Sequence, residues 1–147
     1  MITPKATITV GASPRDVITY IADPATAPVW MKALETSELI TRGPIQPGSR
    51  FREVQSAGGE RIETICEVVE YDGETRYAWR SVGDGPAQYG GGFTATPSDA
   101  GTELRYEGWA TATGRLAERE AAWARQAQRE AEAELAAIKE AVEQKAD

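Results

Sequence analysis

The pattern of apolar and polar positions changes period within the first 30 residues. In "PKATITV" apolar and polar residues alternate, which predicts a strand with one buried face. "SPRDVITYIA" then carries the signals of a helix start, with Ser13 as N-cap and Pro14 at the first helical position. A second start follows in "DPATAPVWMKAL", where Asp23 is the cap, and Pro28 should keep this helix short or broken. We expect one strand followed by two short helices.

From Leu34 to Thr113 the pattern is that of successive strands. Six strand-like segments are separated by stretches rich in glycine, proline and aspartate, the residues that favour turns. The segments are "LETSELIT", "SRFREVQS", "RIETICEVVEY", "TRYAWRSV", "AQYGGGFTA" and "GTELRYEGWA".

Two tight turns would set the register of three neighbouring strands. A two-residue turn at Gly58 and Gly59 would place these residues opposite each other: Phe51 and Cys66, Glu53 and Thr64, Gln55 and Ile62. A type I′ turn at Asp72 and Gly73 would pair Val68 with Tyr77, Cys66 with Trp79, and Thr64 with Ser81. Both turns select the same inner face of the middle strand, namely Ile62, Thr64, Cys66 and Val68, and leave Glu63 and Glu67 outside.

Three consecutive glycines, Gly90 to Gly92, lie inside a predicted strand, which they should weaken. They could make a bend, a bulge, a phosphate cradle or an empty space. Neither a Lys-Ser/Thr pair nor a helix start follows, which argues against a phosphate cradle. Without a bulge, one face holds Tyr89, Gly91, Phe93 and Ala95 opposite Leu104, Tyr106, Gly108 and Ala110, and the other face holds Glu103, Arg105 and Glu107. A bulge would reverse this parity, so the side taken by Trp109 stays open.

The chain then continues into one long predicted helix, "GRLAEREAAWARQAQREAEAELAAIKEAVEQK". Its expected inner stripe has bulky residues at the ends and alanine in the middle, with charged residues on the opposite side. The stripe consists of Leu116, Trp123, Ala124, Ala127, Ala131, Leu135, Ile138 and Val142. Alanine in the middle would leave volume between this helix and the sheet.

Composition excludes several function classes. The 147 residues, 41% of them hydrophobic, suit one globular domain, and the net charge of −7 argues against nucleic acid as a partner. Because histidine is absent, triads that use histidine and histidine-bound zinc are excluded. The single Cys66 excludes an internal disulfide. We expect no metal, no cofactor, no membrane span and a cytoplasmic location.

The order of elements resembles the START/Bet v1-like (SRPBCC) superfamily, and most closely its polyketide cyclase/dehydrase-like branch of bacterial proteins. The resemblance spans nearly the whole chain and is carried by "ASPRDVITYIADPATAPVW", "PGSRFRE", "EVVEYDGETRYAW" and "GTELRYEGWA". It implies a single α+β domain over residues 1–147 with the helix-grip fold. In that fold a curved seven-stranded antiparallel sheet surrounds the long C-terminal helix, and an apolar cavity lies between them.

Within such a fold, the glycine run would let a bent strand curl around the helix, and Gly91 would leave space beneath Ala124 and Ala127. Aromatic residues would line the cavity, although the same residues could equally be core. The expected ligand-binding residues are Trp30, Phe51, Thr64, Tyr77, Trp79, Ser81, Gly91, Phe93, Trp123 and Ala127.

Glu53 is the candidate acid or base, because the hairpin register turns it inward beside Thr64 and Ser81. Burial would raise its pKa and suit it to proton transfer; alternatively, an open strand edge or a bulge leaves it in water. The hydroxyls of Tyr89 and Tyr106, and also that of Tyr77, could donate hydrogen bonds to a ligand carbonyl or be structural. The outer face should hold Arg76, Arg80 and Arg105 as partners of Glu63, Glu67 and Glu107, and Cys66 should be a small buried apolar residue.

Three function classes fit these observations: a cyclase- or dehydrase-like enzyme, a non-catalytic binder of an apolar small molecule, and a protein-interaction domain with a filled cavity, as in chaperone regulators. Small residues on the helix and on the facing strand favour a ligand pocket. We therefore predict that the chain binds a small hydrophobic molecule of polyketide, aromatic or lipid type, as a monomer or homodimer, with cyclase-like activity left open.

Overall fold

A computed structural model describes residues 1–57, 60–83 and 87–146. Strand β1 (Lys5–Val10) is followed by α1 (Pro14–Ala22), the 3-10 helix η1 (Pro24–Thr26) and α2 (Ala27–Trp30). Six more strands and two helices complete the chain: β2 (Leu34–Leu39), β3 (Arg50–Ala57), β4 (Glu60–Tyr71), β5 (Arg76–Val82), β6 (Ala87–Ser98), β7 (Gly101–Ala112), α3 (Arg115–Glu118) and α4 (Glu120–Ala146).

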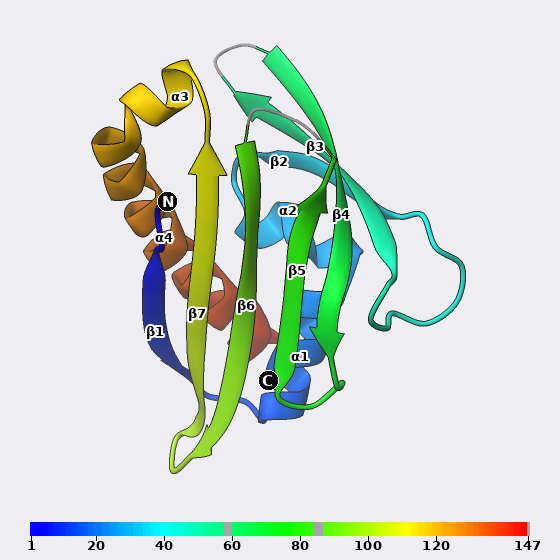
Figure 1. The fold of residues 1–147 in the computed structure, drawn as a ribbon. Helices are drawn as coiled ribbons and strands as arrows, with labels where there is room; N and C mark the ends of the chain where they lie inside the picture. Colours follow the sequence, from blue (N-terminus) through cyan, green and yellow to red (C-terminus); the bar gives the residue numbers. More distant parts are fainter. Residues whose placement is uncertain (58–59, 84–86, 147) are drawn as a thin grey trace.

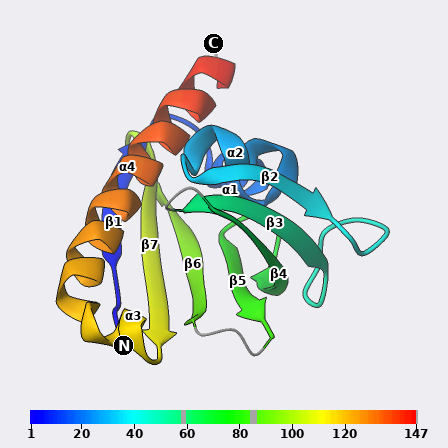
Figure 2. The ribbon, with the colours of Figure 1, turned by 90° about the horizontal axis from the view of Figure 1, so that it is seen from above.

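All seven strands form one antiparallel sheet in the order β1-β7-β6-β5-β4-β3-β2. The sheet is strongly curved, and α1, α2 and α4 lie on its concave side (Figures 1 and 2). This arrangement is the α+β helix-grip fold, as predicted.

The two helix starts are where the sequence places them. Ser13 Oγ accepts a hydrogen bond from the backbone N–H of Asp16 at 3.2 Å, which caps α1. Asp23 Oδ1 accepts one from the N–H of Ala25 at 3.0 Å and caps η1. The second helix is broken into η1 and α2, as the interrupting proline predicted.

The predicted registers of β3–β4 and β6–β7 are confirmed. Glu53 lies opposite Thr64, whereas Gly58 and Gly59 themselves are outside the described residues. In the other pair, Gly91 lies opposite Gly108 without any shift of register. Trp109 therefore takes the outer face, where 36% of its surface is exposed.

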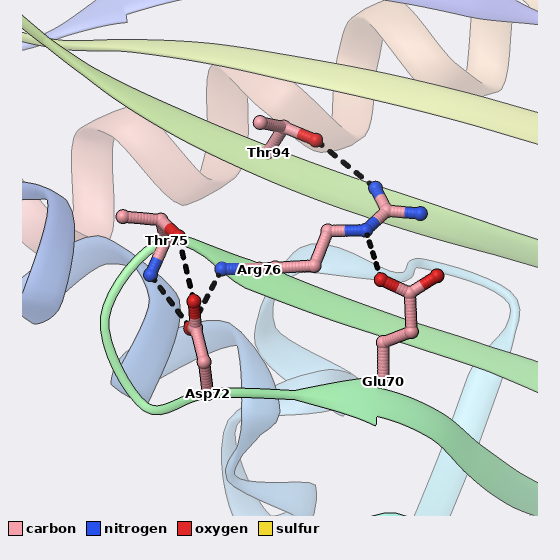
Figure 3. A network of polar contacts seen from close by, with 5 residues as sticks. All are labelled: Glu70, Asp72, Thr75, Arg76 and Thr94. Carbon is pink, nitrogen blue, oxygen red and sulfur yellow. Dashed lines mark hydrogen bonds and ion pairs between the residues drawn. The ribbon is translucent and has the colours of Figure 1, made fainter.

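The predicted register of β4–β5 is wrong by two positions, since Cys66 lies opposite Ser81 instead of Trp79. One cause is an irregularity between Val68 and Glu70. The other is a loop wider than a two-residue turn, held by the carboxylate of Asp72 (Figure 3). It accepts four hydrogen bonds of 2.7 to 2.9 Å, from the N–H groups of Glu74, Thr75 and Arg76 and from the Thr75 hydroxyl. A shift of two leaves the predicted inner face unchanged.

On the outer face, two of the expected ion pairs are present: Arg80 with Glu67 at 4.0 Å and Arg105 with Glu107 at 2.8 Å. Arg76 instead pairs with Glu70 at 3.1 Å and donates to the Thr94 hydroxyl at 3.0 Å (Figure 3). The partner of Glu63 is a different arginine, Arg52.

Of the described side chains in the predicted inner stripe of the long helix, only those in the C-terminal half are fully buried. Ala131, Leu135, Ile138 and Val142 are buried, whereas Trp123, Ala124 and Ala127 are half-buried; the side chain of Leu116 is outside the described part. The predicted single helix is divided into α3 and α4. None of the helices described here combines the length and the apolar character needed to cross a membrane.

Side chains of α4 also bind the backbone of the edge strand β1. Gln128 accepts from the N–H of Lys5 at 3.1 Å and donates to its carbonyl at 2.6 Å. Lys139 donates to the carbonyl of Thr9 at 2.7 Å, and Glu143 accepts from the N–H of Gly11 at 2.8 Å. The helix thus satisfies backbone groups that an edge strand leaves unpaired.

Candidate functional site

The carboxyl group of Glu53 lies inside the molecule. Glu53 is on the concave face of β3 and only 3% of its surface is exposed, which excludes the alternative in which it points into water. It lines a small cavity of about 20 Å³ between β2, β3, β5 and the helices α1 and α2. Four predicted site residues line the same cavity: Trp30, Phe51, Tyr77 and Trp79.

The surroundings of Glu53 disfavour its charged form. Burial raises the pKa of this carboxyl to about 7, and a hydrogen bond from Gln55 Nε2 at 3.3 Å opposes the rise. Among the described residues, no lysine or arginine forms an ion pair with Glu53. A carboxyl group that titrates near neutral pH can either donate or accept a proton.

A groove of about 300 Å³ adjoins this cavity between α2, the start of β2, β3 and α4. Trp30 and Met31 line both the groove and the cavity. Gln55, which donates to Glu53, also lines the groove and links the two spaces. The remaining lining residues are Lys32, Ala33, Leu34, Glu130, Ala133 and Glu134.

Glu134 is a candidate that the sequence analysis missed. It is half-buried on the inner side of α4, and its pKa is raised to about 8 by burial first, then by the charges of Glu130 and Glu53. The signal for it was present, because position 134 follows Ala131 by three residues and precedes Ile138 by four, which places it on the inner stripe. In the sequence analysis, the charged residues of this helix are placed on the opposite side.

A second polar group lies elsewhere on the concave face, around Tyr89. The Tyr89 hydroxyl is buried next to Cys66 and Thr64 but makes no hydrogen bond of good geometry within the described structure. Ser81 Oγ accepts from the backbone N–H of Tyr89 at 3.0 Å. Burial raises the pKa of both Tyr89 and Cys66. The thiol is therefore protonated at neutral pH, as expected for a buried apolar cysteine.

The expectation of empty space at Gly91 is corrected. A Cβ at this position would lie 2.7 Å from Tyr106 Cε1 and 2.8 Å from the Tyr106 hydroxyl. The aromatic ring therefore fills the space that the missing side chain provides. Tyr106 in turn packs against Phe93, with ring centroids 5.0 Å apart, and Phe93 meets Trp30 edge to face at 5.7 Å. Burial, with the charges of Glu134 and Glu130, raises the pKa of Tyr106.

The predicted residues on α4 do not join this site. Trp123 and Ala127 are half-buried, and neither lines the cavity beside Glu53 or the adjoining groove. The structure thus gathers the predicted aromatic residues of α2, β3 and β5 around Glu53. Gln55 bonds to Glu53, and Glu130 and Glu134 line the adjoining groove.

The sequence matches the family described as polyketide cyclase / dehydrase and lipid transport over residues 1–143. The chain belongs to this family. Among curated protein sequences, none matches it significantly.

Three solved structures show the same fold as this member of the family. A Thermus thermophilus protein is 22% identical with a TM-score of 0.79, over 95% of this chain and 96% of that one. The Zhui aromatase/cyclase from a Streptomyces species is 22% identical with a TM-score of 0.77, over 99% and 95% of the two chains. The di-domain aromatase/cyclase BexL is 24% identical with a TM-score of 0.75, and this chain covers 47% of it.

Proposed function

We propose that the chain binds a small, largely apolar molecule of polyketide, aromatic or lipid type, and that Glu53 is the polar group that meets it. One observation carries this proposal: a carboxyl group without an ion-pair partner among the described residues lies buried among aromatic side chains and lines a cavity. Unpaired carboxyl groups are rarely buried, because burial disfavours their charged form. Membership of the family supports a ligand-binding role.

The ligand would enter through the groove between α2 and α4. The groove, at about 300 Å³, lies at the lower end of the range of roughly 300–1,000 Å³ that is usual for ligand pockets. The cavity beside Glu53, at about 20 Å³, has room for little more than one water molecule. Trp30 and Met31 line both spaces, and movement of the flexible Met31 side chain would join them.

The chemistry available to a bound molecule is proton transfer. Glu53, with a pKa raised to about 7 by burial, could take a proton from a carbon next to a carbonyl group. It could then return that proton to the alkoxide oxygen formed when the new carbon–carbon bond closes a ring. Tyr77 lines the cavity beside Glu53, whereas Tyr89 and Tyr106 line neither that cavity nor the groove, so the proton transfer proposed here is assigned to Glu53. The same site without turnover would serve a non-catalytic binder.

The direct test is a calorimetric titration with 2-acetylnaphthalene, an uncharged aromatic ketone. We expect saturable binding to one site, weakened about tenfold or more in the variant Ala133→Trp, because the exposed Ala133 lines the groove. Ala136→Trp is the control: Ala136 is exposed on α4 but does not line the groove. Absence of saturable binding to the parent, or equal binding by both variants, would contradict the proposal.

A second candidate is a protein-interaction domain with a filled interior, and the small volume beside Glu53 favours it. In that case the ketone should not bind, and a stoichiometric protein partner should bind the parent and Ala133→Trp equally well. Loss of the partner in Ala133→Trp would place the partner in the groove and contradict a filled interior.

A further inference from the structure

We infer that the molecule bound in the groove carries a basic amino group, so that its ligand is an apolar amine. This inference rests on the proposed function and specifies its ligand class. It follows from the charges around the two adjoining spaces and from the partners that those charges lack.

Three carboxyl groups surround the path from the groove to the cavity. Glu130, which is exposed, and Glu134, which is half-buried, line the groove from α4, and Glu53 lines the adjoining cavity. Within the described part of the chain, none of the three forms an ion pair with lysine or arginine. Lys32 lines the groove but is exposed, and no ion pair joins it to these groups.

Glu53 also has unused hydrogen-bonding capacity. A carboxylate has about four lone-pair positions for donors, and the described donors supply one hydrogen bond to Glu53, from the neutral amide of Gln55. Glu53 lines the cavity together with Trp30 and Phe51. A ligand ammonium group brings a positive charge and three donors to this point.

The alternatives fit less well. No group of three or more acidic or cysteine side chains among the described residues is placed to hold a metal ion, so an organic cation suits the site better than an inorganic one. A carboxylate or phosphate ligand would add negative charge beside Glu134 and Glu53. The walls between the carboxyl groups are apolar, with Trp30, Met31 and Leu34 among them, and they suit a hydrophobic body attached to the ammonium group.

Binding of a cation should depend on pH with a definite sign. Burial raises the pKa of Glu53 to about 7 and that of Glu134 to about 8. The other titratable groups that interact electrostatically with them include Tyr77, Tyr89, Tyr106 and Cys66, whose raised pKa values keep them neutral. The carboxyl group of Glu130 also acts on Glu134. The carboxyl groups of Glu53 and Glu134 therefore ionise as pH rises from about 6 to about 8.5, while a primary amine carried on an sp³ carbon stays largely protonated over this interval. Affinity for the amine should rise over this interval.

The experiment compares three probes that share one aromatic body: 2-(aminomethyl)naphthalene, 2-(hydroxymethyl)naphthalene and 2-naphthoate. In titration calorimetry at pH 8 we expect the amine to bind about tenfold more tightly than the alcohol, and the carboxylate to bind more weakly than both. The advantage of the amine over the alcohol should shrink at pH 6. It should also shrink in Glu134→Gln but persist in Glu132→Gln, which removes the same charge from the exposed side of α4.

The outcomes separate this inference from the function on which it rests. If the alcohol binds as tightly as the amine at both pH values, the amine inference is wrong and the ligand-binding function stands. Equal loss in Glu134→Gln and Glu132→Gln would mean general attraction to an acidic surface, which also overturns it. If no probe binds, both proposals fail. The pH dependence in the parent protein tests the inference even if Glu134→Gln does not fold.

Discussion

The ring of Tyr106 on β7 occupies the space that a side chain at Gly91 on β6 would need. The two neighbouring glycines make room in the same way on the outer face. A Cβ at Gly90 would meet the indole of Trp109 and a backbone carbonyl, and one at Gly92 would meet the guanidinium group of Arg76. None of the three glycines has a positive φ. The run therefore exists for close packing on both faces of the sheet and not for a turn.

The substitutions Gly91→Ala and Gly92→Ala should consequently differ in stability. At Gly91 the added methyl group would meet the buried ring of Tyr106, and we expect the free energy of unfolding to fall by about 1–3 kcal/mol. At Gly92 it would meet the far end of the long Arg76 side chain, which can shift by weakening its bonds to Glu70 and Thr94. The gain of about 0.4–1 kcal/mol from a stiffer unfolded chain should offset part of that cost and leave this variant nearer the parent. Urea denaturation measures both values, and equal losses would contradict this explanation.

Replacing the buried carboxyl group should stabilise the protein above neutral pH. The pKa of Glu53 in the folded chain is about 7, whereas that of glutamate in an unfolded chain is about 4.3. Between these values the folded chain binds more protons than the unfolded one, so the free energy of unfolding falls as pH rises through this interval and stays lower above it. Glu53→Gln lacks this loss and should be more stable than the parent at pH 8 by about 1–3 kcal/mol.

Unfolding curves at pH 5 and pH 8 measure the effect of Glu53→Gln. The difference between parent and variant should be larger at pH 8 than at pH 5. Glu63→Gln, at an exposed position on the next strand, serves as control and should show no comparable dependence on pH. A variant that loses stability equally at both values would mean that the carboxyl group is not buried in the way described.

The loop between β4 and β5 depends on one aspartate. Asp72→Ala would remove the acceptor for three backbone N–H groups and the Thr75 hydroxyl. We expect a loss of about 1–2 kcal/mol at pH 7, measured by thermal unfolding. These hydrogen bonds hold the pKa of Asp72 well below its usual range, so the stabilisation is present above about pH 4 and is lost as pH falls further. Asp99→Ala, in the exposed β6–β7 turn, should change stability far less.

Gln128 on α4 should protect the backbone of β1 from solvent exchange. In Gln128→Ala both hydrogen bonds to Lys5 are lost, and each is worth about 1 kcal/mol or less at an exposed position. We expect faster hydrogen exchange at the Lys5 amide with little change in global stability. Gln126→Ala is the control, because Gln126 bonds to Glu130 on its own helix. Unchanged exchange at Lys5 would contradict the role of the helix.

The sequence could predict the inner face of the sheet because hydrophobic alternation has a period of two. A register error of one position would have turned Cys66 outward, whereas the actual error of two positions on β5 kept Trp79 on the inner face. The error itself could not be foreseen from "YDGE", since it comes from the Asp72 loop and from the irregularity before Glu70. The dipeptide Asp-Gly predicts a turn, but it does not predict that the Asp72 carboxylate will accept hydrogen bonds from later residues and hold a longer loop.

The candidate site was predictable only on the strands. Glu53 is two residues from Phe51 on the same strand, so both side chains lie on the buried face. The register of one hairpin is enough to predict this. Glu134 was missed because charged residues are placed on the outer side of the helix in the sequence analysis, although the spacing from Ala131 and Ile138 indicates the inner side. The ring of Tyr106 fills the space at Gly91 through a contact between two neighbouring strands. The pattern of residues along a single strand gives no information about such a contact.

The attachment of α4 to β1 through Gln128, Lys139 and Glu143 also bears on how copies of this chain could associate. With β1 covered, the sheet offers its opposite edge, β2, for pairing with a strand from another chain. That edge carries the exposed carboxylates of Glu35 and Glu38. Glu35 is paired with Arg61, so it is mainly Glu38 that would repel an identical strand laid against this edge. Strand-by-strand polymerisation is therefore disfavoured at one side by a helix and at the other by charge.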